Sequence, residues 1–386
     1  MSNNVSIYQS SMEFESRILK ESASIIKLGL FSNVYILGIW RKYLLRKEKV
    51  NKKCTIIRFR CIFDFCFKSA LFKSFRIIEY SLNALYFCEK IKVSSVTVHS
   101  SSLLPLGFFL KLRFKARLTY APHELESERI GLSKYQRIFI RLLEKKILPF
   151  ADSISAPSFL IARWYSKSYK VKLPYLIYNT PFLKRPKFET QYFGVRNRFN
   201  IPKESVLFLY HGILDEGRGI EIICKSFQGS KRGFHILFCG FGNLTKTIKK
   251  YQEKCSAIHL INAVPPNMIL NIAGQADVGI CLIENSCLSY KFSLPNKLFE
   301  YMHAGLAVIS SNFPTMRQVV SQTGVGWSIE PSSKSLNLLL QNISKREILL
   351  RKKYSLRAKK IYCWEKNENN ILRMYRFINE KKSIHK

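Results

Sequence analysis

The chain has 386 residues, of which 47% are hydrophobic, and it carries a formal net charge of +37. This length and composition are sufficient for two globular domains of ordinary size. Charged side chains interrupt the first thirty residues, and no later window offers about 18 uncharged apolar residues. A secretory signal and a membrane-spanning helix are therefore not expected, and we predict a cytoplasmic protein.

The positive charge is shared by both halves of the chain. Residues 1–182 hold 31 basic and 12 acidic residues, which gives +19, and the remaining 32 basic and 14 acidic residues give +18. Runs at 41–53, 111–117 and 345–360 mix Lys and Arg with Leu, Tyr and Phe. Such a surface attracts polyanions, either nucleic acid or an anionic membrane. A general lysine bias without functional meaning is the alternative.

Ten cysteines are scattered along the chain without the paired C-x-x-C spacing of zinc sites. Since many lie in apolar runs, we predict buried, reduced thiols rather than metal ligands or disulfides, which favours a reducing compartment. They are Cys54, Cys61, Cys66, Cys88, Cys224, Cys239, Cys255, Cys281, Cys287 and Cys363.

Strand-like and helical patterns alternate along the first half of the chain, which indicates a parallel sheet covered by helices. We predict helices at 12–28, closed by Gly29, and at 134–148. The predicted strands are residues 33–39, 54–60, 93–99, 116–121 and 151–158, and the half ends at 176–182.

A second alternation follows, so the predicted fold class is α/β with two doubly wound, Rossmann-like domains facing a cleft. Ligands are expected in that cleft, because such sheets bind at the carboxyl ends of their strands. An amphipathic helix at 364–380 closes the chain. The strands of this half are predicted at 206–212, 234–242, 257–264, 276–283 and 306–311. The predicted boundaries are 1–182 for the first domain, 183–205 for a connector, 206–360 for the second domain and 361–386 for a helix packing across both.

The stretch "LYHGILDEGRGIEIICKSF" (209–227) combines the end of a strand with glycines and an arginine. Gly217 and Gly219 flank Arg218 just before a helix that starts near Ile220. Glycines let a phosphate approach the backbone, the helix N-terminus offers free N–H groups, and Arg218 can add charge-assisted bonds. An ordinary turn with a solvated arginine fits the same pattern. The later turn "FCGFGNL" (238–244) lacks the third glycine and the downstream acid of a dinucleotide fingerprint, so NAD binding is not predicted.

A polar loop containing Ser293 runs into a short apolar helix at Pro295. If Pro295 occupies the first helical turn, the helix N-terminus points to the predicted cleft. Lys297 and Glu300 are three residues apart and share one face near the helix start. Lys297 can neutralise a diphosphate, and Glu300 can accept hydrogen bonds from vicinal hydroxyls. A surface ion pair between the two is the alternative.

These segments occur in one order over residues 205–330 and closely resemble the carboxy-terminal domain of group 1 glycosyltransferases, which are retaining sugar-nucleotide enzymes of GT-B fold. The first half is similar more loosely. The matching stretches are "YHGILDEGRGIE", "CGFGN", "INAVPPNMILNIAGQADVGICLI", "SLPNKLFEYMHAGLAVISS" and "GVGW", with "LTYAPHELESE", "ADSISAPS" and "YNTP" in the first half.

The resemblance implies that Arg218 and Lys297 hold the donor diphosphate and act in catalysis, and that Glu300 binds the ribose. Gly212, Gly242 and Ser293 complete the predicted donor-binding set.

In the first domain, the resemblance implies that His123 faces the reacting sugar from the acceptor side, with Glu124 nearby. His99, at the end of its strand, is a second candidate, although a lone histidine is more often structural. Two positions depart from the family pattern. Phe292 replaces a second glutamate eight residues before Glu300, and Ile213 replaces an Arg or Lys after Gly212. The contacts to the donor at these two positions are therefore expected to differ from those of the family.

The implied activity is retaining transfer of a hexose-type sugar from a nucleotide-sugar donor to a lipid-linked oligosaccharide or a growing surface polysaccharide, such as lipopolysaccharide, O-antigen or capsule. The basic, aromatic first domain suggests a peripheral protein on the anionic inner face of the cell membrane. Since the sequence has no D-x-D motif, neither a metal ion nor another cofactor is expected. Alternatives are a nucleotide-sugar epimerase on the same scaffold, a basic nucleic-acid-binding protein, and an inactive family member. No nucleic-acid-binding module is recognised, so a nucleic-acid partner is not expected.

Overall fold

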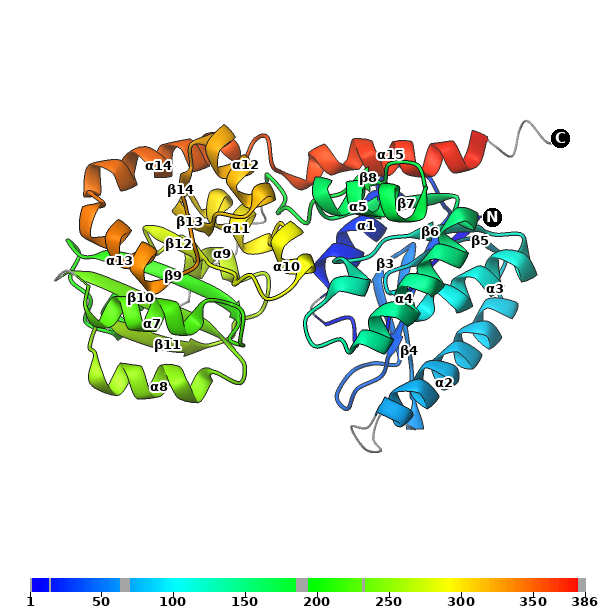
Figure 1. Ribbon diagram of the computed structural model, residues 1–386. Coiled ribbons are helices and arrows are strands. Elements are labelled where there is room, and N and C mark those ends of the chain that lie inside the picture. The colour runs from blue at the N-terminus through cyan, green and yellow to red at the C-terminus, as the bar shows by residue number, and fades with distance from the viewer. Residues whose placement is uncertain (1, 14, 63–69, 185–193, 231–232, 381–386) are drawn as a thin grey trace. The chain divides into compact units, whose positions relative to one another are not determined.

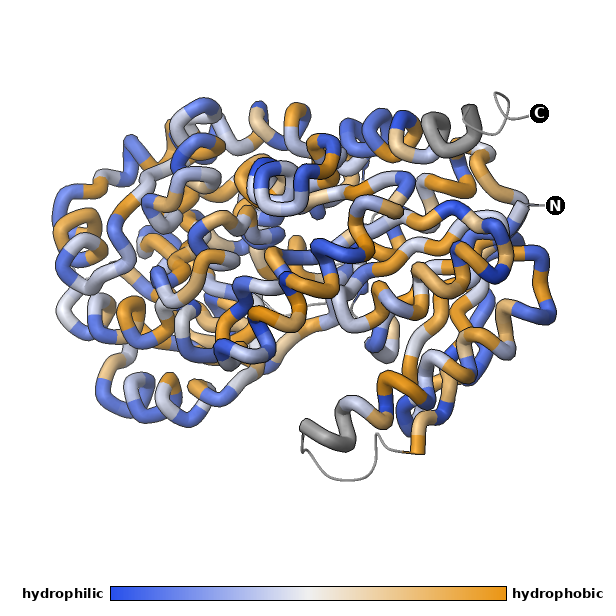
Figure 2. The backbone as a smooth tube through the Cα atoms, turned by 45° about the vertical axis from the view of Figure 1, so that its right-hand side comes forward, coloured by the Kyte–Doolittle hydropathy of each residue, from blue (hydrophilic) through white to orange (hydrophobic). Residues whose placement is uncertain are grey.

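The computed structural model describes residues 2–13, 15–62, 70–184, 194–230 and 233–380. The chain divides into two compact units, one formed by Met1–Ile177 with Asn367–Lys386 and the other by Tyr178–Lys366. Each unit is a largely parallel sheet covered by helices (Figure 1). The strands supply the buried hydrophobic core, whereas the helices alternate hydrophobic and hydrophilic positions (Figure 2). The prediction of two Rossmann-like α/β bodies is confirmed.

The first unit contains a sheet of eight strands in the order β3-β4-β2-β1-β5-β6-β7-β8. Its neighbouring strands are parallel, except that β3 runs antiparallel to β4. Its strands are β1 (Asn3–Ile7), β2 (Asn33–Ile39), β3 (Lys47–Asn51), β4 (Cys54–Phe59), β5 (Val93–Val98), β6 (Arg117–Tyr120), β7 (Ser153–Ala156) and β8 (Tyr175–Leu176). Its helices are α1 (Ser16–Lys27), α2 (Ala70–Glu89), α3 (Leu104–Phe114), α4 (Lys134–Ile147) and α5 (Phe159–Tyr169), with short 3-10 turns η2 (Ser101–Leu103), η3 (Glu126–Glu128) and η4 (Leu148–Phe150).

The second unit contains six parallel strands in the order β11-β10-β9-β12-β13-β14. This is the doubly wound order, and the direction of winding reverses between β9 and β12. The strands are β9 (Val206–Ile213), β10 (Phe234–Phe241), β11 (Ile258–Asn262), β12 (Val278–Cys281), β13 (Ala307–Ser311) and β14 (Gly326–Ile329). The helices are α6 (Val195–Arg198), α7 (Ile220–Gln228), α8 (Thr245–Lys254), α9 (Ile269–Ala273), α10 (Leu288–Phe292), α11 (Asn296–Ala304), α12 (Pro314–Thr323), α13 (Ser333–Asn342) and α14 (Lys345–Ala358).

The closing helix α15 (Trp364–Glu380) begins in the second unit and continues in the first. Tyr375 of this helix donates or accepts a hydrogen bond with Thr97 of β5 at 2.8 Å, and its ring lies edge-on to Phe31. Ser24 and Lys27 of α1 donate to the carboxylate of Glu368 at 3.0 and 2.7 Å. The apolar face predicted at 364–380 is therefore covered by α1 and β5. No helix among the described residues is long and apolar enough to cross a membrane.

Strand β1 lies in the middle of its sheet, yet the sequence pattern gave no prediction for it. Asn4 and Ser6 alternate with the apolar residues of the strand but are themselves buried, so the strand lacks the continuous apolar run expected of a central parallel strand. The Asn4 amide donates to the hydroxyls of Ser95 and Thr97 on β5, each at 3.2 Å. Buried hydrogen bonds between strands thus replace the apolar contacts that the pattern requires.

Other expectations differ in detail from the structure. Helix α1 begins at Ser16 rather than at residue 12, because Met12 has a left-handed φ of 65° that a helix cannot include. Nine cysteines are free and seven of these are buried, as predicted, whereas Cys66 lies outside the described residues. Part of the predicted connector, residues 185–193, also lies outside them.

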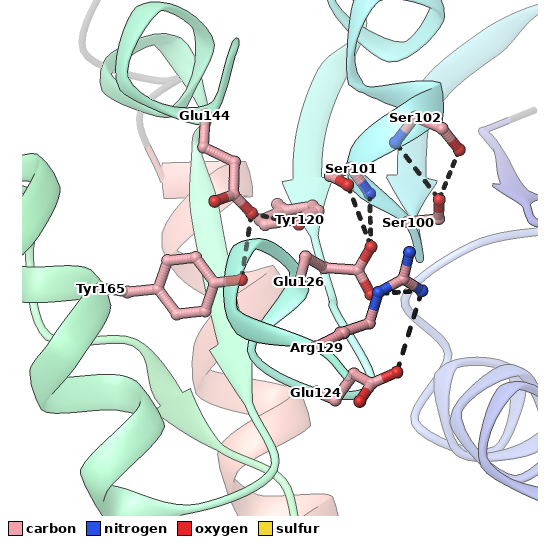
Figure 3. Close-up of polar contacts among 9 residues, drawn as sticks. All are labelled: Ser100, Ser101, Ser102, Tyr120, Glu124, Glu126, Arg129, Glu144 and Tyr165. Carbon is pink, nitrogen blue, oxygen red and sulfur yellow. Dashed lines mark hydrogen bonds and ion pairs between the residues drawn. The ribbon is translucent and has the colours of Figure 1, made fainter. Parts of the chain in front are cut away.

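A buried carboxylate attaches α4 to the rest of the first unit. Glu144 is fully buried and accepts hydrogen bonds from the hydroxyls of Tyr120 (2.8 Å), Tyr165 (3.1 Å) and Tyr169 (2.6 Å). Figure 3 shows Tyr120 and Tyr165 pointing toward this carboxylate. Burial raises the pKa of Glu144 to about 7, although the three hydroxyl bonds act in the opposite direction.

We predict that Glu144→Gln makes the stability of the protein less dependent on pH. The pKa of Glu144 is higher in the folded protein than in the unfolded chain, so folding favours the neutral carboxyl. The resulting contribution to the free energy of unfolding is complete below the unfolded pKa and is lost as the pH rises through about 7. Relative to Glu144→Gln, the wild type should lose roughly 3 kcal/mol of unfolding free energy over this interval. Urea unfolding at about pH 5 and about pH 8 measures the difference, with the exposed Glu253→Gln as control. A pH-independent difference would contradict the assignment.

Candidate functional site

Two cations of the second unit lie beside aromatic rings near the point where its winding reverses. The loop after β9 carries Arg218, whose guanidinium carbon is 4.7 Å from the ring centre of Tyr290 on α10. Lys297 on α11 has its ammonium 3.7 Å from the ring centre of Tyr210 on β9. Segments distant in sequence therefore meet where the carboxyl ends of β9 and β12 converge, the usual ligand position in such sheets.

The side chain of Lys297 is largely buried and has no counter-ion at ion-pair distance among the described residues. Lys297 is only 9% exposed, and the described residues place no carboxylate at ion-pair distance from it. Burial lowers the pKa of Lys297 to about 8, and the positive charge of Arg218 acts in the same direction. The interpretation of Lys297 and Glu300 as a surface ion pair is therefore wrong. Because Lys297 and Arg218 are both positively charged and the site is partly shielded from water, it favours an anionic ligand.

Glu300 faces a histidine that the sequence did not single out. Its Oε2 atom is 3.2 Å from Nε2 of His211, at the carboxyl end of β9. Burial lowers the pKa of His211 to about 3, and Lys297 contributes in the same direction, so the imidazole is neutral at neutral pH. His211 Nε2 is buried and forms no hydrogen bond with the described residues. The only sequence signal for His211 is its position before Gly212.

The two predicted glycines shape the loops around these cations. Gly212 has a φ of 113°, and a Cβ there would lie 3.8 Å from Lys297 Nζ, so the backbone conformation rather than space requires glycine. Gly242 has a φ of 154°, and a Cβ there would collide with the carbonyl of Leu214. The carboxylate of Asp215 also accepts a 2.7 Å bond from the Asn243 amide, which joins the turns after β9 and β10.

The segment before Lys297 differs from the predicted plain loop, because it contains the short helix α10. Ser293 follows α10 and donates from its hydroxyl to the carbonyl of Tyr290 at 2.8 Å, so it supports the residue whose ring lies beside Arg218. Pro295 is the N-cap of α11 rather than a residue of its first turn. Helix α11 has no side-chain cap, which leaves its first N–H groups available to a ligand.

The predicted histidines of the first unit, His99 and His123, follow the carboxyl ends of β5 and β6 and lie close together. The rings of His99 and His123 have their centres 5.3 Å apart, and that of Tyr8 is 5.0 Å from that of His123. His99 Nδ1 contacts the carbonyl of Ala121 at 3.2 Å, which makes Nδ1 the protonated nitrogen. Burial lowers the pKa of His99 to about 4 and lowers that of His123 as well. Both Nε2 atoms are buried and without a partner among the described residues.

An arginine that the sequence did not single out supports this group. Arg17 is buried, pairs with Glu21 at 2.7 Å and donates to the carbonyl of Pro122 at 3.2 Å, directly before His123. Its positive charge lowers the pKa of His123, after burial itself. Nothing in the spacing of Arg17 marks it, since it lies in an ordinary amphipathic helix.

Glu124 is held by ionic contacts of its own loop. Arg129 lies 3.8 Å from Glu124 and 4.0 Å from Glu126, and Glu126 also accepts bonds from the amide and hydroxyl of Ser101 (Figure 3). The structure thus gathers His123, Glu124 and His99 in the first unit and Arg218, Lys297, Glu300, Gly212, Gly242 and Ser293 in the second. Among the described residues, no group of His, Cys, Asp or Glu is arranged to hold a metal ion.

The second unit matches a known family. Residues 194–361 match the family model for Glycosyl transferases group 1. This region is a group 1 glycosyltransferase domain. The chain is accordingly a glycosyltransferase, and the family resemblance seen in its motifs is confirmed. The assignment favours a transferase over the epimerase and nucleic-acid-binding alternatives. No curated protein sequence matches the chain.

Solved structures give the fold of the glycosyltransferase over nearly its whole length. Sucrose-phosphate synthase from Thermosynechococcus elongatus is similar with a TM-score of 0.81 at 15% identity, over 99% of this chain and 100% of that one. Anabaena HepE in complex with UDP-glucose has a TM-score of 0.71 at 11% identity, over 96% and 98%. WaaG, a glycosyltransferase involved in lipopolysaccharide biosynthesis, has a TM-score of 0.63 at 11% identity, over 96% and 99%. The fold is therefore GT-B.

We predict that two single substitutions move the pKa of Lys297 in opposite directions. Arg218→Gln removes a like charge and should raise this pKa from about 8, whereas Glu300→Gln removes an opposite charge and should lower it. Reductive ¹³C-methylation followed by an NMR pH titration measures the lysine directly, with Lys297→Arg to assign the resonance. Shifts of equal sign in the two variants would contradict a shared electrostatic site.

Proposed function

We propose that the protein transfers a sugar from a nucleotide-sugar donor to an acceptor hydroxyl with retention of configuration, and that Arg218 and Lys297 bind the donor diphosphate. The observation that carries this proposal is the largely buried Lys297, which has no carboxylate at ion-pair distance among the described residues. A diphosphate would supply the missing negative charge and would raise the lowered pKa of Lys297 on binding.

Other features of the second unit support a nucleotide sugar as the ligand. The uncapped N-terminus of α11 can donate N–H groups to phosphate oxygens. Glu300 can accept hydrogen bonds from the ribose hydroxyls, and the neutral imidazole of His211 lies 3.2 Å from its Oε2 atom. Among the structurally similar proteins, HepE binds UDP-glucose, which makes a uridine donor the first candidate here.

The proposed chemistry requires stabilisation of the leaving diphosphate. The bond from the anomeric carbon to the phosphate oxygen breaks, the bond to the acceptor oxygen forms on the same face, and the acceptor proton passes to the departing phosphate. Arg218 and Lys297 would stabilise the negative charge that develops on this group, because both are in place before the reaction. The proposal involves no protein nucleophile and no metal ion.

The first unit is proposed to supply the acceptor side. His123 would contact the reacting sugar through its neutral Nε2, which is buried and without a partner among the described residues. Arg17 would act as a positioning residue, because it holds the backbone directly before His123. Glu124, half exposed beside Arg129, would lie near this contact.

We further propose a lipid-linked oligosaccharide or a growing surface polysaccharide as the acceptor, at the cytoplasmic face of the cell membrane. The net charge of +37 supports the proposal that the enzyme acts at the surface of an anionic membrane. The structurally similar WaaG is involved in lipopolysaccharide biosynthesis, and surface glycans are the corresponding acceptor class.

We predict that Arg218→Ala and Lys297→Ala each weaken binding of UDP or another nucleoside diphosphate. Each substitution should cost roughly 1.5 to 3 kcal/mol, since charge-assisted bonds are lost. Isothermal titration measures the affinity. Lys291→Ala, an exposed lysine on α10 in the same segment, serves as the matched control and should bind as the wild type does. Wild-type affinity in both site variants would remove the phosphate assignment.

We predict sugar transfer into a lipid fraction. Purified protein, membrane extract and a panel of radiolabelled UDP-, GDP- and TDP-sugars should yield label in the lipid phase for one donor, also in the presence of EDTA. NMR of the anomeric proton in the product should show the configuration of the donor. An inverted anomer would refute retention, and failure of every donor with intact nucleotide binding would favour an inactive family member.

A further inference from the structure

Helix α4 turns a hydrophobic face outward. Tyr135, Ile138, Phe139 and Leu142 recur at i, i+3, i+4 and i+7, the spacing of one helix face, and all of them are exposed, Tyr135 by 83% and Phe139 by 65%. We call these residues the α4 face. A helix of a soluble domain normally buries such a stripe, so a stripe left in solvent indicates a partner.

The inner side of α4 explains why this stripe is not buried. The two buried residues of the helix are Glu144 and Ile147. Glu144 accepts hydrogen bonds from three tyrosine hydroxyls. Arg141 donates to Glu128 at 2.8 Å. Polar bonds thus fix which side of α4 faces the sheet, and rotating the α4 face inward would leave Glu144 without these donors.

Basic side chains surround the α4 face. The helix carries five basic residues, and its one acidic residue is the buried Glu144. Lys134, Lys145 and Lys146 are exposed, and Lys145 and Lys146 follow the stripe directly. Long lysine side chains can place their ammonium groups at lipid headgroups while their stems lie along an apolar surface.

Neighbouring elements also expose apolar side chains. Helix α3 packs beside α4 and exposes Phe109 and Leu112. Phe150, which follows α4 in η4, is also exposed, and its ring centre lies 5.3 Å from that of Phe108 on α3. Aromatic residues with flanking lysines are the composition that lies in the interfacial layer of a bilayer.

We infer that the α4 face is a docking surface for an anionic lipid membrane. The charge selects this occupant, because a second copy of the same face would bring the lysines of both copies together, whereas anionic headgroups complement them. The inference rests on the proposed lipid-linked acceptor and deepens it, since it names the residues that would bring the enzyme to that acceptor.

The test uses the full-length protein and sucrose-loaded vesicles of phosphatidylcholine, with or without phosphatidylglycerol. The wild type should sediment with the mixed vesicles and much less with pure phosphatidylcholine. The triple variant Tyr135→Gln, Phe139→Gln and Leu142→Gln should reduce the partition coefficient roughly tenfold or more. The double variant Lys145→Gln and Lys146→Gln should reduce it by roughly fivefold for each lysine.

A matched control lies in the second unit. Leu338 on α13 and Leu349 on α14 are 60% and 59% exposed, and the double variant Leu338→Gln and Leu349→Gln should bind vesicles as the wild type does. Circular dichroism establishes that the variants fold. Equal binding of the triple variant and the wild type would overturn the inference, and so would equal binding to both vesicle types. A dimer that the triple variant abolishes, without vesicle binding, would assign the α4 face to a second copy.

Two further measurements separate this inference from the proposed function. UDP affinity should be unchanged in the triple variant, while transfer to acceptor presented in vesicles should fall with the partition coefficient. Vesicle binding without nucleotide binding in the wild type would leave the docking surface standing and refute the proposed donor. Nucleotide binding without vesicle binding would refute the docking surface and leave the proposed donor standing.

Discussion

The donor site depends on one constraint: the largely buried Lys297 places its ammonium over the ring of Tyr210, with no carboxylate at ion-pair distance among the described residues. A lysine in this position stays charged at neutral pH only narrowly, because burial and the nearby Arg218 both disfavour the charged form. The protein tolerates this cost in a place where a negatively charged ligand would remove it. A site of this kind favours an anion before any ligand is identified.

The doubly wound order of the second sheet creates that arrangement. Strand β9 lies between β10 and β12, so the loops that follow β9 and β12 begin side by side although about seventy residues separate them. One loop contributes Arg218, and the other leads into α10 and α11, which contribute Tyr290 and Lys297. The hydrogen bond from Ser293 to the Tyr290 carbonyl then connects α10 to the start of α11. Local turns thus fix the positions of groups that only the sheet topology could bring together.

The sequence predicted the parts of this arrangement that leave a periodic or spaced signal. Most strands were predicted within one or two residues, and the glycine turns with Arg218 and Lys297 were assigned to one site. His211, Tyr210 and Tyr290 were not predicted, because their roles depend on contacts between elements far apart in the chain. Strand β1 was missed for a similar reason, since the partners of Asn4 lie on β5. Spacing identifies residues on one element, and only tertiary contacts identify their partners.

Helix α4 is a second case in which the spacing of residues does not determine their tertiary contacts. Its sequence has apolar residues on more than one side, so periodicity alone does not decide which side faces the sheet. The decision comes from Tyr120, Tyr165 and Tyr169, which converge on Glu144 from β6 and α5. A buried carboxylate with three donors makes the rotated helix unfavourable, whereas exposed Phe139 and Leu142 cost little in a helix that stays at the surface. The hydrogen bonds of Glu144 therefore fix the orientation of α4, and the exposed α4 face is not needed for the fold. A binding partner would explain its hydrophobic side chains.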